Sequence, residues 1–359
     1  MTTEQLKDKC RGSLVGGAVG DALGYPVEFV DSFNEIRAKY GENGLTEYDI
    51  SYTWPDTDVS NRYALVSDDT QMTLYTAEGL LEAIRKDKPI VPMICNAYLV
   101  WFGNQVGKKV KVSYKSTMSQ IKRLNQRRAP GNTCLTSLFS IYSGKEPVNS
   151  SKGCGGVMRV APIGIYGASH DWTLEETVRI AGEVAEITHQ HPLSTYSSGA
   201  LAVIVQQCIT AENIDSKSFK DIVNKSVDVV ANVYGEHAPA MENFRQIIIK
   251  TLELEHNQLL DWEIIENNIG GGWVAEETLA IAILSVLRHI DDFKDCLICA
   301  VNHGGDSDST AAVAGNIIGA ILGYDAIPER YKTCLELHDL IVSVADDITT
   351  MMPTKSIRI

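Results

Sequence analysis

Two short acidic segments carry the side chains that are best suited to chemistry. Residues 67–70 read Ser-Asp-Asp-Thr, and residues 304–310 read Gly-Gly-Asp-Ser-Asp-Ser-Thr. In both, two aspartates stand among hydroxyl groups just before a run of apolar residues, so each segment is expected to begin a helix. Capping explains one such residue, because a single side chain can accept the free N–H groups of a first turn. Two aspartates exceed that need and indicate a cation site.

The two segments also resemble each other. If they converge in space, Asp68, Asp69, Asp306 and Asp308 bring four negative charges to one place. Such a group is hard to keep ionised without a metal ion, because each charge disfavours the ionisation of its neighbours. The candidate ligands are hard oxygens, with neither His nor Cys in the acidic segments, which favours Mg²⁺ or Mn²⁺ over zinc.

Two further acids lie nearer the N-terminus. Glu28 stands between apolar Val27 and Phe29, where loss of solvent is expected to raise the pKa of its carboxyl group. Asp21 lies inside an expected helix, and we interpret it as a buried carboxylate that ties down a neighbouring loop. Glu28 is the candidate for direct chemistry.

The elements that must position these acids have strong periodic patterns. The first expected helix runs from Glu4 to about Leu23, with a glycine at every fourth position from Gly12 to Gly24. This spacing lets another backbone approach closely. The run from Ala311 to Gly323 is uncharged and rich in Ala and Gly, which predicts a buried helix packed tightly against its neighbours.

A glycine-rich loop is a further candidate for binding. The loop of Gly153, Cys154, Gly155 and Gly156 follows no convincing strand, so it is not a Rossmann motif, although its N–H groups can hold phosphate oxygens. Cys154 is either a nucleophile or, as we expect, a small packed thiol.

Two single residues each allow a structural and a functional interpretation. His189 falls between two helical segments, where a histidine is often a cap or a hydrogen-bonding core residue. Trp273 follows three glycines and is either part of the core or a stacking surface for a base.

Composition excludes several classes of protein. The chain has 359 residues, 44% of them hydrophobic, and a net charge of -14, which predicts a large core and argues against nucleic acid or acidic membranes as partners. Residues 108–128 are the exception, with eight basic residues and no acid; we expect a solvated helix face, the alternative being a patch for an anionic substrate. No targeting signal or membrane span is evident, so a cytoplasmic protein is expected.

Eight scattered cysteines are typical of reduced thiols. Cys296 and Cys299, with His289 and His303 nearby, raise the alternative of zinc, but the apolar residues around the two cysteines favour a buried helix.

Helical periodicity dominates the chain and alternating runs are few. We therefore expect an all-α fold in one compact domain over residues 1–359, and a monomer. Residues 31–66 lack clear periodicity and are expected to form a long loop or lid, and residues 351–359 a frayed tail.

The chain also resembles the ADP-ribosylglycohydrolase family, which includes the dinitrogenase-reductase-activating glycohydrolases. The resemblance extends from Gly16 to about Gly323. It depends on five motifs in this order: Gly-Asp-Ala-Leu-Gly at 20–24 with Glu28 following, Ser-Asp-Asp-Thr at 67–70, Gly-Cys-Gly-Gly-Val-Met-Arg at 153–159, Thr-His-Gln-His-Pro at 188–192, and Gly-Gly-Asp-Ser-Asp-Ser-Thr at 304–310. Together, in order, these motifs are highly specific.

This resemblance implies an all-helical enzyme with a binuclear Mg²⁺ or Mn²⁺ centre that hydrolyses the bond at C1″ of the distal ribose of ADP-ribose. The positions that match the family's metal ligands are Ser67, Asp68, Asp69, Asp306, Asp308 and Ser309. Glu28 matches the acid near the metals, Gly153 to Gly156 the loop around the phosphates and distal ribose, His189 a pocket histidine, and Trp273 a position next to adenine. Ser67 and Ser309 stand where Thr is frequent, and Cys154 where some relatives carry Asn.

Several functions are compatible with this resemblance. The first is removal of ADP-ribose from protein arginine, a class common among bacterial-looking members of the family. The nearest alternative is cleavage of O-linked ADP-ribose, on serine or in O-acetyl-ADP-ribose. A binding protein without catalysis and a metal-dependent phosphohydrolase are the other two. The leaving-group pocket distinguishes the first two, and no motif identifies it.

Overall fold

The computed structural model describes residues 1–52 and 63–352, and within them all regular secondary structure is helical. Extended backbone pairs only as isolated bridges, such as Val30 with Gly305 and Gly153 with Val274. The α-helices are α1 (Thr3–Gly24), α2 (Phe33–Tyr40), α3 (Asp68–Lys86), α4 (Ile90–Val106), α5 (Asn132–Tyr142), α6 (Ala161–Ser169), α7 (Leu174–Glu186), α8 (Pro192–Thr210), α9 (Ser216–Tyr234), α10 (Pro239–Glu253), α11 (Asp261–Asn268), α12 (Ala275–Arg288), α13 (Phe293–Val301), α14 (Ser307–Leu322), α15 (Glu329–Cys334) and α16 (His338–Thr350). The expected all-α class is confirmed.

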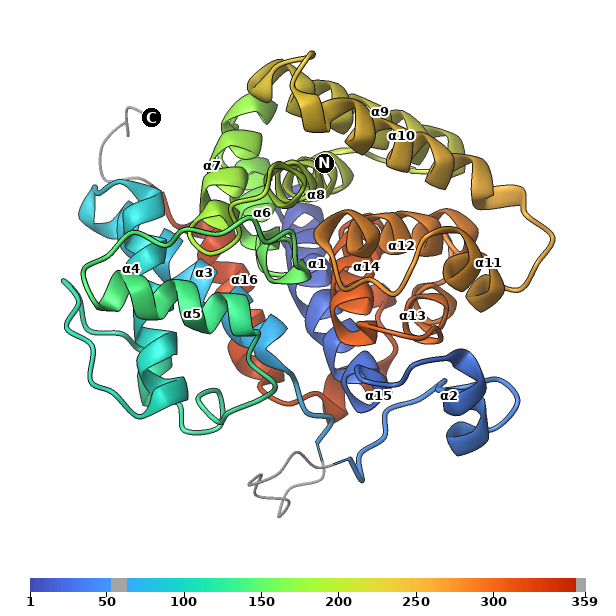
Figure 1. Cartoon of the computed structure of the whole chain (residues 1–359), viewed down its shortest axis with the longest axis horizontal. Coiled ribbons are helices and arrows are strands. Elements are labelled where there is room, and N and C mark those ends of the chain that lie inside the picture. The colour runs from blue at the N-terminus through green and yellow to red at the C-terminus, as the bar shows by residue number, and fades with distance from the viewer. Residues whose placement is uncertain (53–62, 353–359) are drawn as a thin grey trace.

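The centre of the fold is the pair formed by α1 and α14, which lie side by side (Figure 1). A Cβ atom added to Gly16 would lie 2.4 Å from the carbonyl oxygen of Gly315, and one added to Gly20 would lie 1.9 Å from that of Ala311. No Cβ can occupy such positions, so the glycine stripe is what allows the two backbones to meet. The predicted close approach is confirmed.

Polar groups fix the register of this pair. The Ser13 hydroxyl donates to the carbonyl oxygen of Asn316, and the Asn316 amide donates to the carbonyl oxygen of Ser13, at 2.9 and 2.8 Å. Both residues are buried, so each bond also avoids the free-energy cost of an unpaired polar group. The other helices surround the pair, with α3 to α5 on one side and α11 to α13 on the other (Figure 1).

The prediction of a continuous loop or lid over residues 31–66 is wrong at its start. Helix α2 occupies Phe33–Tyr40, with Phe33 and Ile36 buried three positions apart on one face. The Phe33 ring stacks on Trp262, with centroids 4.9 Å apart. A helix this short owes its stability to tertiary packing, which its own sequence does not reveal. Residues 53–62 of the expected lid and residues 353–359 of the expected tail lie outside the described residues.

The basic segment 108–128 is not the helix face that we expected. It contains a single short 3-10 turn, Met118–Gln120, and otherwise irregular backbone. Lys108, Lys109 and Lys111 are exposed, as predicted, whereas Arg128 is buried. Within the described part of the chain, none of the helices is both long and apolar enough to cross a bilayer.

Candidate active site

The two acidic segments begin α3 and α14, and the fold brings these two helix ends together. The Ser309 hydroxyl donates to Asp69 Oδ2 at 2.8 Å, which joins one segment directly to the other. The Ser309 N–H donates to Asp308 Oδ1 at 2.9 Å. Asp68, Asp69, Asp306 and Asp308 are all buried, and Asp308 is only 1% exposed. The predicted convergence of four carboxylates is therefore present in the fold.

Asp21 holds the start of α3 in place. Its carboxylate accepts from the backbone N–H groups of Ser67 and Thr70, and from the Thr70 hydroxyl at 2.5 Å. Complete burial and the nearby charge of Asp308 raise the pKa of Asp21 to about 7. The expectation that Asp21 ties down a neighbouring segment is confirmed, since every one of these bonds positions the acidic helix start.

A buried ion pair that the sequence analysis missed supports the same segment. Arg128 Nη1 donates to Glu336 Oε2 and to the carbonyl oxygen of Val66, both at 3.0 Å. Glu336 Oε2 accepts from the Val66 N–H, and the Arg128 carbonyl oxygen accepts from the Asp68 N–H. No motif marks Glu336, and Arg128 belonged to the run that we expected to be solvated. No local signal links two residues so far apart in the sequence.

Glu28 lies beside the acidic pair of α14. It follows the 3-10 turn Tyr25–Val27, and one carboxylate oxygen each from Glu28, Asp306 and Asp308 lie within 4.8 Å of one another. Burial, followed by the charge of Asp308, raises the pKa of Glu28 well above its ordinary value. The expected rise is confirmed; of the two apolar neighbours in the sequence, Val27 is buried and Phe29 is 58% exposed.

The glycine-rich loop also borders this cluster, since the Cys154 thiol lies near Asp306 and Asp69. Gly153 forms a bridge with Val274, and the Cys154 N–H donates to the carbonyl oxygen of Trp273 at 3.2 Å. Burial and the charges of Asp306 and Asp69 raise the pKa of the Cys154 thiol far above its usual range. A thiol that stays protonated is a poor nucleophile, which supports the packed-thiol interpretation.

His189 lies directly behind that loop. A Cβ atom on Gly155 would lie 2.8 Å from His189 Cε1, so only glycine fits there. His189 Nδ1 is 2.8 Å from the Thr188 hydroxyl, and the ring is buried. Burial and the charge of Arg159 lower the pKa of His189 to about 3, which keeps the ring neutral. The structure thus places His189 as the support of the loop.

Trp273 is not a core residue. Its side chain is 46% exposed and stacks on Phe29, with ring centroids 6.0 Å apart and planes 24° from parallel. Because the Trp273 carbonyl oxygen accepts a hydrogen bond from Cys154 N–H, the pair of Trp273 and Phe29 lies beside the glycine-rich loop. In the sequence, Phe29 is notable only as the neighbour of Glu28, and its position next to that acid was the available signal.

The residues present fit a divalent cation. Glu28 Oε2 and Asp306 Oδ2 are buried and have no hydrogen-bond partner among the described residues. Leaving a buried carboxylate oxygen unpaired is costly, and a bound cation removes that cost. The surrounding donors are carboxylates and hydroxyls, the oxygen ligands that Mg²⁺ and Mn²⁺ take.

The chain is thus an all-α protein with a buried acidic site at the starts of two helices, α3 and α14. A solved structure titled "ADP-ribosylglycohydrolase-related protein complex" superposes with a TM-score of 0.67 and 22% identity, covering 97% of this chain and 99% of the other. The sequence profile of the ADP-ribosylglycohydrolase family matches residues 2–357. The chain therefore belongs to the ADP-ribosylglycohydrolase family.

Two characterised relatives match over nearly the whole chain. The ADP-ribosyl-[dinitrogen reductase] glycohydrolase of Rhodospirillum rubrum is 26% identical over 341 residues, which cover 94% of this chain and 93% of the relative. The ADP-ribosylarginine hydrolase Tri1 of Serratia proteamaculans (strain 568) is 24% identical, covering 96% of this chain and 80% of the relative. Family membership implies a substrate that contains ADP-ribose.

Proposed function

We propose that this protein hydrolyses the C1″ glycosidic bond of ADP-ribose attached to protein arginine, using two Mg²⁺ or Mn²⁺ ions. The observation that carries the proposal is the Ser309–Asp69 hydrogen bond, because it puts the two acidic segments into one buried site. The residues that would hold the ions are Ser67, Asp68, Asp69, Asp306, Asp308 and Ser309. Bound ions would supply Lewis acidity and an activated water for attack on the ribose.

The remaining site residues have separate roles in this proposal. Glu28 carries a proton to or from the reacting groups, because its carboxyl group lies beside Asp306 and Asp308 and has a free buried oxygen. Cleavage at C1″ builds positive charge on the ribose, which the neighbouring carboxylates oppose. The N–H groups of the glycine-rich loop bind the phosphates, and Trp273 with Phe29 stacks on adenine.

Arginine is proposed as the linked residue because of the two characterised relatives. One is named for ADP-ribosylarginine and the other for ADP-ribosylated dinitrogen reductase. The name of the Serratia relative supports the nitrogen linkage over an O-linked one.

A product assay tests linkage, metal dependence and reaction type together. The protein is incubated with arginine-linked and serine-linked ADP-ribosyl peptides and Mg²⁺, with and without EDTA. We expect free ADP-ribose from the arginine peptide only, and none with EDTA. Faster release from the serine peptide would instead assign the O-linked activity. AMP would indicate a phosphohydrolase, and binding without product would indicate a binding protein.

Glu28→Gln tests the catalytic role within the same assay. The amide keeps the shape of the side chain and cannot exchange the proton, so turnover should fall by about 10²- to 10⁴-fold while ADP-ribose still binds. Glu35→Gln is the matched control, because Glu35 is exposed on α2 and lies outside the site. Equal turnover in the Glu28 variant and the control would remove Glu28 from the chemistry.

A further inference from the structure

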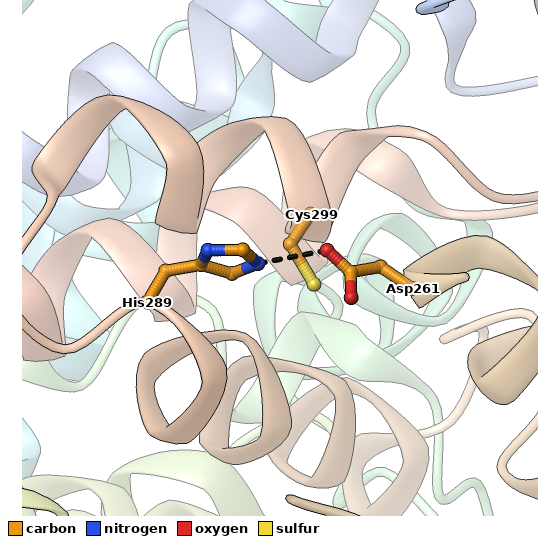
Figure 2. A group of neighbouring side chains, drawn as sticks. All are labelled: Asp261, His289 and Cys299. Atoms are coloured by element: carbon orange, nitrogen blue, oxygen red, sulfur yellow. Dashed lines mark hydrogen bonds and ion pairs between the residues drawn. The ribbon is translucent and has the colours of Figure 1, made fainter. Parts of the chain in front are cut away.

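A second group of potential metal ligands lies away from the acidic site. Asp261 is the first residue of α11, His289 directly follows α12, and Cys299 lies in α13. A carboxylate oxygen, a ring nitrogen and the sulfur of these residues all lie within 4.8 Å of one another. Figure 2 shows the three side chains pointing toward a common centre from three separate elements.

The contacts around Asp261 leave one of its oxygens facing the other two ligands. His289 Nε2 lies 2.7 Å from Asp261 Oδ2, and Arg288 Nε donates to Asp261 Oδ1 at 2.5 Å. Arg288 is itself fixed, because its Nη1 donates to the carbonyl oxygens of Glu255 and Asn257. A hydrogen bond to the non-ligating oxygen is the usual way in which a protein orients a carboxylate toward a metal.

Two of the three residues, Asp261 and His289, are partly exposed to solvent. Asp261 and Cys299 border a cavity of about 520 Å³, and His289 borders another of about 700 Å³. The side chains of Asp261 and His289 are 27% and 25% exposed, whereas Cys299 is buried. The carboxylate and the imidazole are therefore partly open to solvent, while the sulfur lies behind them.

We propose that Asp261, His289 and Cys299 form a zinc site, with water as the fourth ligand. Sulfur, nitrogen and oxygen together are the donors that zinc takes, whereas the acidic site offers only hard oxygens. On binding, the Cys299 thiol and His289 Nε2–H each release a proton to solvent, with the imidazole left neutral as its Nδ1–H tautomer, and the Asp261–His289 hydrogen bond is replaced by bonds from both residues to the ion. Of the cysteine pair that raised zinc in the sequence, only Cys299 belongs to this group, and Asp261 joins it from another helix.

The position of the site gives zinc a structural role. Glu266, five residues after Asp261 on α11, accepts from the N–H groups of Gly304 and Phe33 at 3.0 and 2.8 Å. Gly304 is the first residue of the second acidic segment. An ion that joins α11 to α12 and α13 would therefore stabilise the support of that segment.

The alternative is that Asp261, Arg288 and His289 form an ion-pair network without metal, and cobalt spectroscopy separates the two. The Cys154→Ser protein is stripped with EDTA and titrated with Co²⁺, because Cys154 faces the acidic site and would add a thiolate signal of its own. With Mg²⁺ present to fill the acidic site, we expect a near-ultraviolet thiolate-to-cobalt band that saturates at one equivalent of Co²⁺. Zn²⁺ should abolish it, and excess Mg²⁺ should leave it unchanged.

Matched cysteine variants assign the band. Cys299→Ser in this background should remove it and weaken Zn²⁺ binding by at least about 100-fold, since even outer-shell partners contribute 10- to 100-fold. Cys296→Ser should retain it, because Cys296 is a buried cysteine on the same helix outside the group. Absence of the band, or a band that survives in a folded Cys299→Ser protein, overturns the proposal. If Cys299→Ser does not fold, X-ray absorption of the zinc-loaded Cys154→Ser protein decides, and a spectrum with no sulfur neighbour refutes the site.

Discussion

Asp308→Asn is expected to stabilise the metal-free protein while removing its response to Mg²⁺. Asp308 is 1% exposed, and its charge raises the pKa of Glu28, Asp69 and Asp306. Two unit charges 4.8 Å apart repel by about 3 kcal/mol at an effective dielectric constant of roughly 20. The carboxyl groups relieve part of this repulsion by taking up protons. The free energy of unfolding without metal should therefore rise by about 1–3 kcal/mol, because the amide retains the acceptor oxygen for the Ser309 N–H.

Urea unfolding in EDTA and in excess Mg²⁺, at about pH 8, measures both effects. Mg²⁺ at 100 times its Kd should raise the free energy of unfolding of the parent protein by about 2.7 kcal/mol, and that of Asp308→Asn by far less. Asp347→Asn is the control for charge alone, since Asp347 is exposed on α16. A variant that is less stable than the parent in EDTA would show that Asp308 acts as a structural acceptor. An unchanged Mg²⁺ increment would show that it is not a ligand.

Three other substitutions test the roles of single residues. His189 has a folded-state pKa of about 3 against an ordinary 6.5, so its stabilising contribution is complete above pH 6.5 and is lost as pH falls toward 3. Between pH 7.5 and pH 5, the free energy of unfolding of His189→Asn should therefore fall by about 2 kcal/mol less than that of the parent protein. Equal falls for the two proteins in urea unfolding would contradict this. Trp273→Ala should weaken ADP-ribose binding in calorimetry by about 1–3 kcal/mol with an unchanged melting temperature, whereas a lower melting temperature with unchanged affinity would make it a core residue. Gly20→Ala forces a Cβ atom to within 1.9 Å of the Ala311 carbonyl oxygen, so it should lower the free energy of unfolding by about 3 kcal/mol or more in thermal unfolding. Gly131→Ala is the tolerated control, because its Cβ atom would meet nothing closer than 3.9 Å.

Features that depend on neighbouring residues were predictable from the sequence. The first helix was expected over Glu4–Leu23 and occupies Thr3–Gly24, where the Thr2 side chain forms a capping box with Gln5. Its glycine stripe predicted a close backbone contact before the partner was known. Helix periodicity, caps and glycine spacing are local properties, because they depend on dihedral preferences and on residues three or four positions apart. The short helix α2 escaped prediction because Trp262, which packs on it, comes from a distant segment.

The partners of the buried polar groups were decided by the tertiary structure alone. The sequence by itself identified Asp69 and Ser309 as candidates for one site, but their hydrogen bond exists only because α1 packs on α14 and thereby aligns the start of α3. The pairing of Arg128 with Glu336 had no signal in the sequence. Cys299 and His289 had raised the alternative of zinc, but nothing in the sequence linked Asp261 to them. Each of these residues has ordinary local preferences. Its partner is selected only when many weak apolar contacts have set the helix packing, since only then does leaving the polar group unpaired become costly.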